Sequence, residues 1–346
     1  MAYTTIDDPS AYFQTALYTG TGATQSVSND GNSDLQPDWV WIKKRSALGN
    51  NSVFDSTRGA YKELVTNGAN AEATDVQLLT QFDTDGFTVG TNSGVNGSGD
   101  TFVAWQWKAN GGTTSSNTDG FTTSTVQANT DAGFSIVTYT TDGSERTIGH
   151  GLGVKPDIII TKPRNAATSW VVTTDIIDGS MDFLVLDSSA AAGTFTRAAP
   201  TSSVFSYLDD SGNNMVSYCF ASKQGFSKFG KYTGNAGGEN GPFVHLGFKP
   251  AFVMIKLASS TQSWDIHDTA RNLFNPMEKR LLPNSSGAEE TRPTSGGSVD
   301  CVDFLSNGFK VRSVESILNS NNGTYIYMAF AENPFVTSTG IPTTAR

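Results

Sequence analysis

The sequence has few of the residues on which metal and disulfide sites are built. Its 346 residues include only two cysteines, Cys219 and Cys301, and three histidines. A disulfide scaffold needs more and closer cysteine pairs, so we expect both cysteines to be buried thiols. A zinc site needs three or four converging ligands, and the histidines do not cluster with the cysteines. We therefore predict neither a metal ion nor a cofactor.

Charged residues and long apolar runs are also scarce. Asp, Glu, Lys and Arg make up 16% of the chain, and the formal net charge is -10. Nucleic-acid affinity depends on Lys and Arg that replace counterions, so we predict no nucleic-acid partner. No stretch approaches the roughly 18 uncharged apolar residues of a membrane span, and residues 1–9 show no secretory signal. We expect a protein that is made in the cytoplasm and is not inserted into a membrane.

The sequence does contain a threefold repeat. Each copy has an apolar segment with a proline near its start, at residues 35–43, 154–162 and 248–256. A Tyr-Thr segment precedes each of them and an aromatic segment closes each copy. Solenoid and propeller units repeat every roughly 20 to 50 residues, whereas this repeat of about 100 residues is long enough to be a folded domain. The pattern therefore predicts tandem copies of one domain.

The closing segments, residues 102–107, 215–220 and 325–330, have the alternating pattern of β-strands. In the first copy Val103, Trp105 and Trp107 share one face, which we predict to be the core face, and the other face is predicted to be half-exposed. About six to eight short strands per copy, joined by Asp-Gly and Asn-Gly turns, are typical of antiparallel β-sandwiches. We therefore predict an all-β protein of three tandem β-sandwich modules that resemble jelly rolls.

Composition also predicts the boundaries of the modules. We expect an N-terminal attachment arm at 1–16, a first sandwich at 17–108, a Gly/Ser/Thr-rich linker at 109–133, a second sandwich at 134–222, a third sandwich at 229–335 and a C-terminal tail at 336–346. The linker composition is that of a flexible segment, so the first module should be held less rigidly than the other two. Thr4, Ile6 and Phe13 are the adhesive positions of the arm, because an extended arm can add a strand to a neighbour's sheet.

Two sets of residues are candidates for surface contacts with a glycan. Asp55 and Arg58 in the first copy recur as Asp268 and Arg271 in the third. Such a pair could bind a sugar or an acid, but a turn with a local ion pair explains it better, because the second copy has Thr174-Asp175 with no matching arginine. Trp170 and Trp264 occupy equivalent positions; core packing explains most tryptophans in a sandwich, and stacking on a sugar at the surface is the alternative.

Patterns that would indicate catalysis are weak. A glycosidase needs two carboxylates that flank the scissile bond, whereas Asp209-Asp210 and Glu289-Glu290 are adjacent residues, which point to opposite sides of an extended chain. We interpret both as solvated turns. The Gly-rich segment 94–99 lacks the lysine of a phosphate loop, and no Gly-x-Ser-x-Gly motif occurs. We predict no catalytic residue and therefore no enzyme.

Four segments, residues 3–9, 101–112, 149–153 and 325–335, resemble repeated β-domain virion proteins of tailed phages that infect marine bacteria, including cyanophages. The likeness covers essentially the whole chain. It implies a non-enzymatic structural protein located in the virion, first of all a tail fibre or receptor-binding appendage. Its partners would be other virion proteins and a host-surface glycan or protein receptor, and closed symmetry suggests a homotrimer. The alternatives are a head or tail decoration protein without a receptor role, and a glycan-binding or glycan-degrading sandwich.

Overall fold

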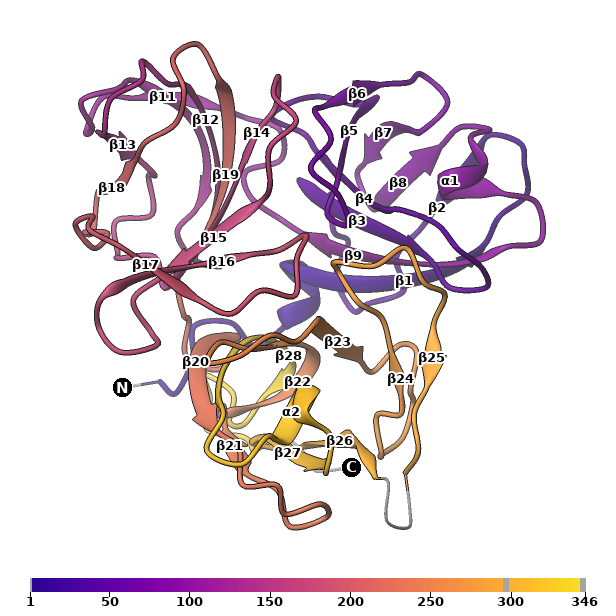
Figure 1. Ribbon diagram of the computed structural model, residues 1–346. Coiled ribbons are helices and arrows are strands. Elements are labelled where there is room, and N and C mark those ends of the chain that lie inside the picture. The colour runs from indigo at the N-terminus through magenta and orange to yellow at the C-terminus, as the bar shows by residue number, and fades with distance from the viewer. Residues whose placement is uncertain (1, 295–298, 343–346) are drawn as a thin grey trace.

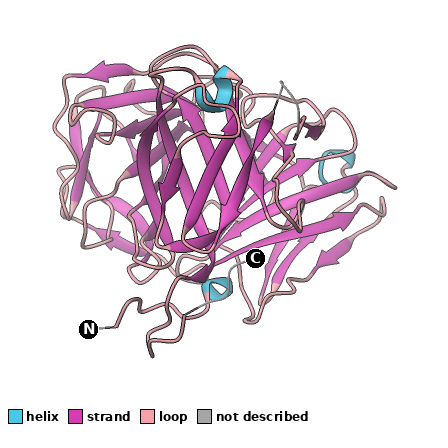
Figure 2. Cartoon of the chain, turned by 90° about the horizontal axis from the view of Figure 1, so that it is seen from below, coloured by secondary structure: helices cyan, strands magenta, loops and turns pink. Residues whose placement is uncertain are grey.

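The computed structural model describes residues 2–294 and 299–342. These residues form antiparallel β-sheets, which confirms the all-β prediction. The helices in this part of the chain are limited to one 3-10 turn, η1 (Pro9–Ala11), and two four-residue helices, α1 (Ser93–Asn96) and α2 (Ser316–Asn319). Figure 2 shows strands through most of the molecule. Among the described residues no helix is long and apolar enough to cross a membrane.

The strands form three groups in chain order, which we call the first, second and third units (Figure 1). In the first unit a six-stranded sheet has the order β1-β9-β3-β4-β5-β6 and a three-stranded sheet has the order β2-β8-β7. Their bounds are β1 (Phe13–Thr19), β2 (Gln25–Val27), β3 (Trp39–Lys44), β4 (Asn51–Asp55), β5 (Lys62–Val65), β6 (Ala73–Thr74), β7 (Leu79–Asp83), β8 (Gly86–Val89) and β9 (Thr101–Trp107).

The second unit has an eight-stranded sheet and a two-stranded sheet. The orders are β10-β11-β12-β19-β14-β15-β16-β17 and β13-β18. Their bounds are β10 (Ser115–Asn117), β11 (Ser124–Asn129), β12 (Phe134–Thr140), β13 (Arg146–Gly149), β14 (Ile158–Pro163), β15 (Val171–Thr174), β16 (Met181–Val185), β17 (Gly193–Phe195), β18 (Val204–Tyr207) and β19 (Asn214–Phe220).

The third unit has sheets of four, three and two strands. The orders are β20-β28-β22-β23, β21-β27-β26 and β24-β25. Their bounds are β20 (Ser227–Thr233), β21 (Phe243–His245), β22 (Phe248–Leu257), β23 (Trp264–Asp268), β24 (Lys279–Arg280), β25 (Glu290–Thr291), β26 (Asp300–Leu305), β27 (Gly308–Ser313) and β28 (Thr324–Pro334). The equivalent strands β9, β19 and β28 each lie between two neighbours in the large sheet.

Both faces of β9, within the large sheet of the first unit, are buried. Phe102 and Ala104 of β9 pack with Val27 and Phe87 of the small sheet. The alternate residues of β9, including Trp105, belong to a different core that also contains side chains of the other two units. The prediction of a half-exposed face is therefore wrong. Alternation shows which residues share a face of a strand, but it does not show what covers that face.

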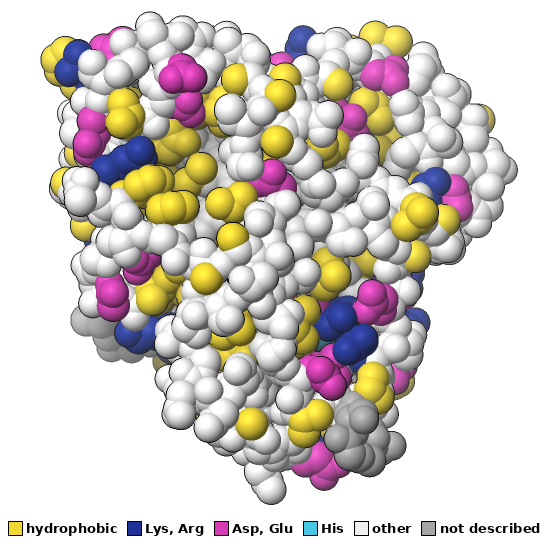
Figure 3. All heavy atoms as spheres, in the orientation of Figure 1, with side chains coloured by type: hydrophobic (Ala, Val, Ile, Leu, Met, Phe, Trp, Pro, Cys, Tyr) yellow, Lys and Arg dark blue, Asp and Glu magenta, His cyan; other side chains and the backbone are white. Residues whose placement is uncertain are grey.

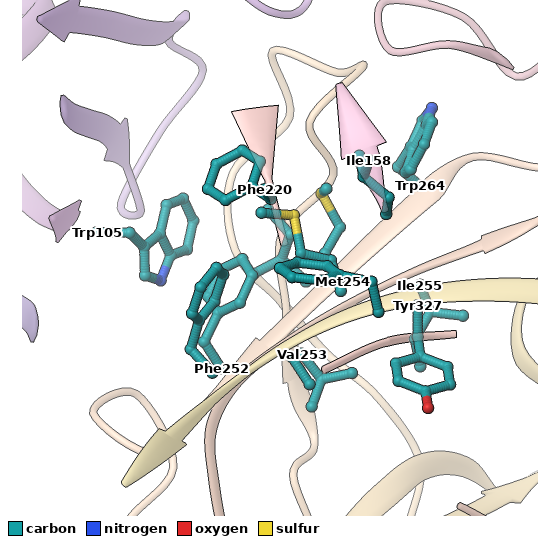
Figure 4. Close-up of a cluster of buried hydrophobic side chains, with 14 of the residues drawn as sticks. Trp105, Ile158, Phe220, Phe252, Val253, Met254, Ile255, Trp264 and Tyr327 are labelled. Atoms are coloured by element: carbon teal, nitrogen blue, oxygen red, sulfur yellow. The ribbon is translucent and has the colours of Figure 1, made fainter. Parts of the chain in front are cut away.

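The three units share one aromatic core. The ring of Trp39 lies 4.3 Å from that of Trp107 in its own unit and 4.7 Å from that of Tyr218 in the second unit. Phe252 of the third unit lies 5.8 Å from Trp107. Figure 4 shows side chains of all three units in this cluster. The first unit is packed into the core as directly as the others, which corrects the expectation that it is held less rigidly.

The segment predicted as a flexible linker, 109–133, is largely ordered by tertiary contacts. Its residues include β10 and β11, and β11 pairs along β12 of the second unit. The carboxylate of Asp38 accepts hydrogen bonds from the backbone N–H groups of Ala109, Gly111 and Gly112, at 2.7 to 2.8 Å. The linker prediction is wrong for these residues because composition does not reveal a distant acceptor such as Asp38.

The predicted attachment arm, 1–16, is folded onto its own chain. Thr4, Ile6 and Phe13 are all buried. The Thr4 hydroxyl donates to the Gln224 carbonyl at 2.8 Å, and the Phe13 ring stacks on Phe330 at 5.2 Å. These three side chains are not available to a neighbouring protein, so their assignment as adhesive positions is wrong. Ile6 and Phe13 belong to the shared core, and Thr4 binds the chain through its hydroxyl.

Candidate functional site

The structure places Asp268 and Arg271 inside the molecule, where the third unit meets the first. Arg271 Nε donates to Asp268 Oδ2 at 2.6 Å, and Trp105 Nε1 of the first unit donates to the same oxygen at 3.0 Å. Arg271 also contacts Glu289 at 3.3 Å, and Arg45 of the first unit binds both oxygens of Glu289 at 2.9 Å. The prediction of a surface contact for Asp268 and Arg271 is wrong, because both side chains are fully buried.

The same arrangement recurs where the first unit meets the second. Asp55 is bound by the guanidinium of Arg58 and by the Tyr218 hydroxyl of the second unit. Arg58 Nη1 donates to Glu72 at 3.0 Å, and Arg164 of the second unit binds both oxygens of Glu72 at 2.8 and 2.9 Å. Burial alone would raise the pKa of Glu72, but the two arginines lower it below its ordinary value. The predicted local Asp–Arg pair is confirmed, and it is also part of a contact between units.

The interface between the second and third units has the same backbone contact without the charges. The Ala192 N–H donates to the Ala258 carbonyl at 2.8 Å. In the other two interfaces the corresponding bonds join Glu72 to Arg164 at 2.7 Å and Glu289 to Arg45 at 2.9 Å. Alanines thus replace the Glu and the Arg together. The second unit also has Thr174 and Ile177 at the positions of Asp55 and Arg58, so this interface lacks the whole charged network.

Trp170 and Trp264 also serve contacts between units. Both are buried, so their prediction as glycan-stacking residues on the surface is wrong. Trp170 Nε1 donates to the Val65 carbonyl of the first unit at 2.7 Å, and Trp264 Nε1 donates to the Val185 carbonyl of the second unit at 3.0 Å. Asn51, the equivalent residue of the first unit, donates to the Leu282 carbonyl of the third unit at 3.2 Å. The three contacts form a closed cycle.

Three buried lysines were missed by sequence reasoning, although each occupies the same place at the end of a repeated apolar segment. Lys43, Lys162 and Lys256 donate to backbone carbonyls of the adjoining unit, at Ser286 (3.1 Å), Ala69 (3.3 Å) and Ser189 (3.3 Å). Burial lowers the pKa of each from the ordinary value of 10.5 to about 8. The recurrence of a lysine at the end of all three apolar segments was the sequence signal that could have identified them.

These lysines predict that the protein becomes more stable as the pH rises above 8. Lys43, Lys162 and Lys256 lose their protons near pH 8 when folded and near pH 10.5 when unfolded, so the unfolded chain binds more protons in between. Burial raises the pKa of Cys219 and Cys301 above 9.0, which opposes the gain above pH 9. We expect the free energy of unfolding to rise by about 2 kcal/mol from pH 8 to 9. Urea denaturation at each pH measures it.

The matched control is a Lys43→Met variant, which removes one of the three groups. It should reduce the rise between pH 8 and 9 by about one third of the lysine contribution. A wild-type free energy of unfolding that stays constant or falls over this interval would show that the buried lysines keep their protons up to pH 9, so that burial does not lower their pKa values.

A fourth group of charged side chains lies in the third unit. His267 Nε2 lies 3.3 Å from Asp265 Oδ2, and Arg280 lies 3.7 Å from the same carboxylate. Arg280 and Arg292 also pair with Glu290, which is exposed. Figure 3 shows Lys or Arg side chains beside Asp or Glu side chains on the face that it draws. Burial alone would raise the pKa of Asp265, but His267 and Arg280 lower it. His267 and Asp265 are fully buried, so no substrate can reach this pair.

The other candidates for chemistry are also structural. Glu289 is largely buried and paired with Arg45, so the prediction of a solvated residue is wrong for Glu289, whereas Glu290 is exposed as predicted and pairs with Arg280. Cys219 and Cys301 are buried thiols, as predicted. Within residues 2–294 and 299–342 there is no group of three or more His, Cys, Asp or Glu side chains that could hold a metal ion.

Fold and contacts together define an all-β protein whose three units are closed into a ring by buried polar contacts. The chain belongs to a family described as a domain of unknown function (DUF7483), whose match covers residues 8–334. No curated protein and no solved structure matches the chain. Because the family match spans all three units, the family's domain corresponds to the whole ring and not to a single repeat.

Proposed function

We propose that the chain is a non-enzymatic structural protein of a tailed-phage virion, where it acts as a tail fibre or another receptor-binding appendage. The proposal of a non-enzymatic role rests on the buried charged side chains, which form contacts between units. Asp55, Arg58, Asp268 and Arg271, which the sequence offers for chemistry, join one unit to the next. A protein that commits these groups to its own assembly is built for rigidity, and binding to other molecules is left to its surface.

The virion location rests on the resemblance of residues 3–9, 101–112, 149–153 and 325–335 to phage structural proteins. A decoration protein on the head or tail, without a receptor role, is the second candidate. The homotrimer stays a prediction. Since the three units of one chain already close a ring through their buried faces, a trimer would have to form through other surfaces. Light scattering of the purified chain measures its oligomeric state.

Purified virions of the phage that encodes the chain test the proposal. We expect mass spectrometry to find the chain in these particles and antibodies against it to label the tail in electron micrographs. The isolated chain should also bind intact host cells. Labelling of the head would support the decoration protein. Absence of the chain from the particles would overturn the virion proposal, and turnover of host polysaccharide by the pure chain would overturn its non-enzymatic part.

A further inference from the structure

Three equivalent strands lie at the same place in the three large sheets. These are β1, β12 and β20, because Phe13, Phe134 and Ser227 pair with the equivalent residues Trp107, Phe220 and Phe330. On one side each strand is bonded to the long closing strand of its unit. The other side of each strand faces the preceding unit in the ring. What occupies this side differs among the three units.

In the second unit another strand fills this position. Strand β11 pairs with β12, with Gln127 opposite Ile136. The side chain of Gln127 is buried and donates to the hydroxyls of Ser56 and Thr57 in the first unit, at 3.0 and 2.8 Å. Strand β11 thus fills the space between the sheet of one unit and the loop of the preceding unit.

In the third unit the edge is occupied by a hydrogen bond to the segment between β19 and β20 and by a lysine. The Phe229 N–H donates to the Ser222 hydroxyl at 3.2 Å. Lys231 donates to the Ile177 carbonyl of the second unit at 2.7 Å. A lysine on an edge strand is a common way of preventing the addition of a further strand. This edge is closed.

In the first unit the edge of β1 is open. The backbone bonds of Lys108 to Tyr12 and of Gly20 to Asp100 set the register, so Gln14, Ala16 and Tyr18 direct their backbone groups to β9. The backbone groups of the residues between them point away from β9. Among the described residues, no backbone group bonds to the outward-pointing N–H and C=O groups of Thr15 and Leu17. No charged side chain lies on this edge, since residues 13 to 19 are Phe-Gln-Thr-Ala-Leu-Tyr-Thr.

A groove of about 670 Å³ runs beside this edge, between the first and third units. Its far wall includes Thr269 and Ala270, which are equivalent to Ser56 and Thr57 at the β11 position. Its lining includes two large apolar side chains that are exposed, Leu17 at 42% and Leu273 at 62%. The groove beside β1 is thus equivalent to the space beside β12 that β11 fills in the second unit. It has the equivalent walls, and the backbone groups that would bind a strand are free.

We propose that this groove binds an extended segment of a partner protein, which adds to β1 as an antiparallel strand. Strand addition supplies backbone hydrogen bonds, and alternate side chains fit the walls. The segment should resemble residues 124–129, Ser-Thr-Val-Gln-Ala-Asn, because these residues fill the equivalent position. It should carry no acidic residue, because the charged residues that line the groove are Asp30 and Glu332. This proposal concerns a surface of the chain and does not depend on a location in a virion.

The probe is a fluorescein-labelled peptide with the sequence of residues 123–130, titrated with the full chain and followed by anisotropy. We expect saturable binding that weakens at least tenfold in a Leu17→Lys variant. That variant places at the open edge the residue type that the third unit has at Lys231, and Leu17 is exposed, so the fold should be kept. Thr15→Pro, which removes an edge N–H without removing a bond to β9, should weaken binding similarly. Leu48→Lys, at an exposed position outside the groove lining, is the control.

Three results would overturn the proposal. The first is the absence of saturable binding of the peptide to the wild-type chain. The second is equal binding to the wild type and to the Leu17→Lys variant, which would place the peptide elsewhere. The third is a concentration-dependent dimer of the wild-type chain that Leu17→Lys abolishes, because a second copy would then occupy the edge.

Discussion

An Asp55→Ala variant is expected to lose about 3 to 5 kcal/mol of its free energy of unfolding, which is typical when one partner of a buried ion pair is removed. The carboxylate of Asp55 accepts hydrogen bonds from the backbone N–H and the guanidinium of Arg58 and from the Tyr218 hydroxyl. Without it, these donors remain buried and Arg58 keeps only Glu72 as a charged partner. Urea denaturation followed by circular dichroism measures the loss.

Asp142→Ala is the matched control, because Asp142 forms a pair of the same chemistry with Arg146 at the surface. Exposed pairs contribute about 0 to 1 kcal/mol, so this variant should be nearly as stable as the wild type. If Asp55→Ala is no more destabilising than Asp142→Ala, the buried network does not hold the first and second units together.

The second unit suggests a variant that separates the effect of an unpaired buried charge from the effect of losing the whole ion pair. The second unit has Thr174 and Ile177 where the first has Asp55 and Arg58. Replacing the whole pair, as Asp55→Thr together with Arg58→Ile, leaves no arginine unpaired at this place. Apolar replacement of a complete buried ion pair is often neutral or stabilising. The double variant should therefore be more stable than Asp55→Ala, and a larger loss would show that the charges themselves are needed at this interface.

A Trp39→Ala variant is expected to lose about 3 to 5 kcal/mol, the usual range for removing a large aromatic side chain from a core. The ring of Trp39 contacts Trp107 in its own unit and Tyr218 and Phe220 in the second unit. Because the third unit is packed on the same cluster through Phe252, all three units should lose protection together. Hydrogen exchange measured unit by unit tests this.

Phe121→Ala provides the comparison for Trp39→Ala. Phe121 is exposed and contacts Arg146, so its removal should cost less than about 1 kcal/mol. Faster hydrogen exchange confined to the first unit in the Trp39→Ala variant would contradict a shared core, since it would show that the units open independently.

The sequence predicted the elements of this fold better than their surroundings. The repeat identified the apolar segment 35–43, and the structure places residues 39–44 in the sheet as β3, between β9 and β4. Alternation in β9 identified the two faces correctly. However, the face carrying Trp105 turned out to meet the other units. A period of two is a property of one strand, whereas the partner of each face depends on packing between segments that are distant along the chain.

The same limit applies to the candidate site. Asp55 and Arg58 are three residues apart, so their pairing could be predicted from the sequence. Glu72 pairs with Arg164, which is 92 residues away, and no pattern in a single sequence connects them. The open edge of β1 had a partial signal in the repeat, because residues 124–129 of the second copy form a strand that has no counterpart beside β1 or β20 among the described residues. An absent segment is recognised only when copies are aligned over their full length.

The ring is closed by one continuous chain, and this changes what a single substitution does. In a ring of three identical subunits each interface is the same, so every substitution is made three times and must suit all three places at once. Here each interface occurs once in the molecule. One junction can therefore exchange its charges for alanines at Ala192 and Ala258, and another can leave a strand position open, while the remaining junctions keep their contacts. A covalently joined ring can carry a distinct binding surface at one of its three positions.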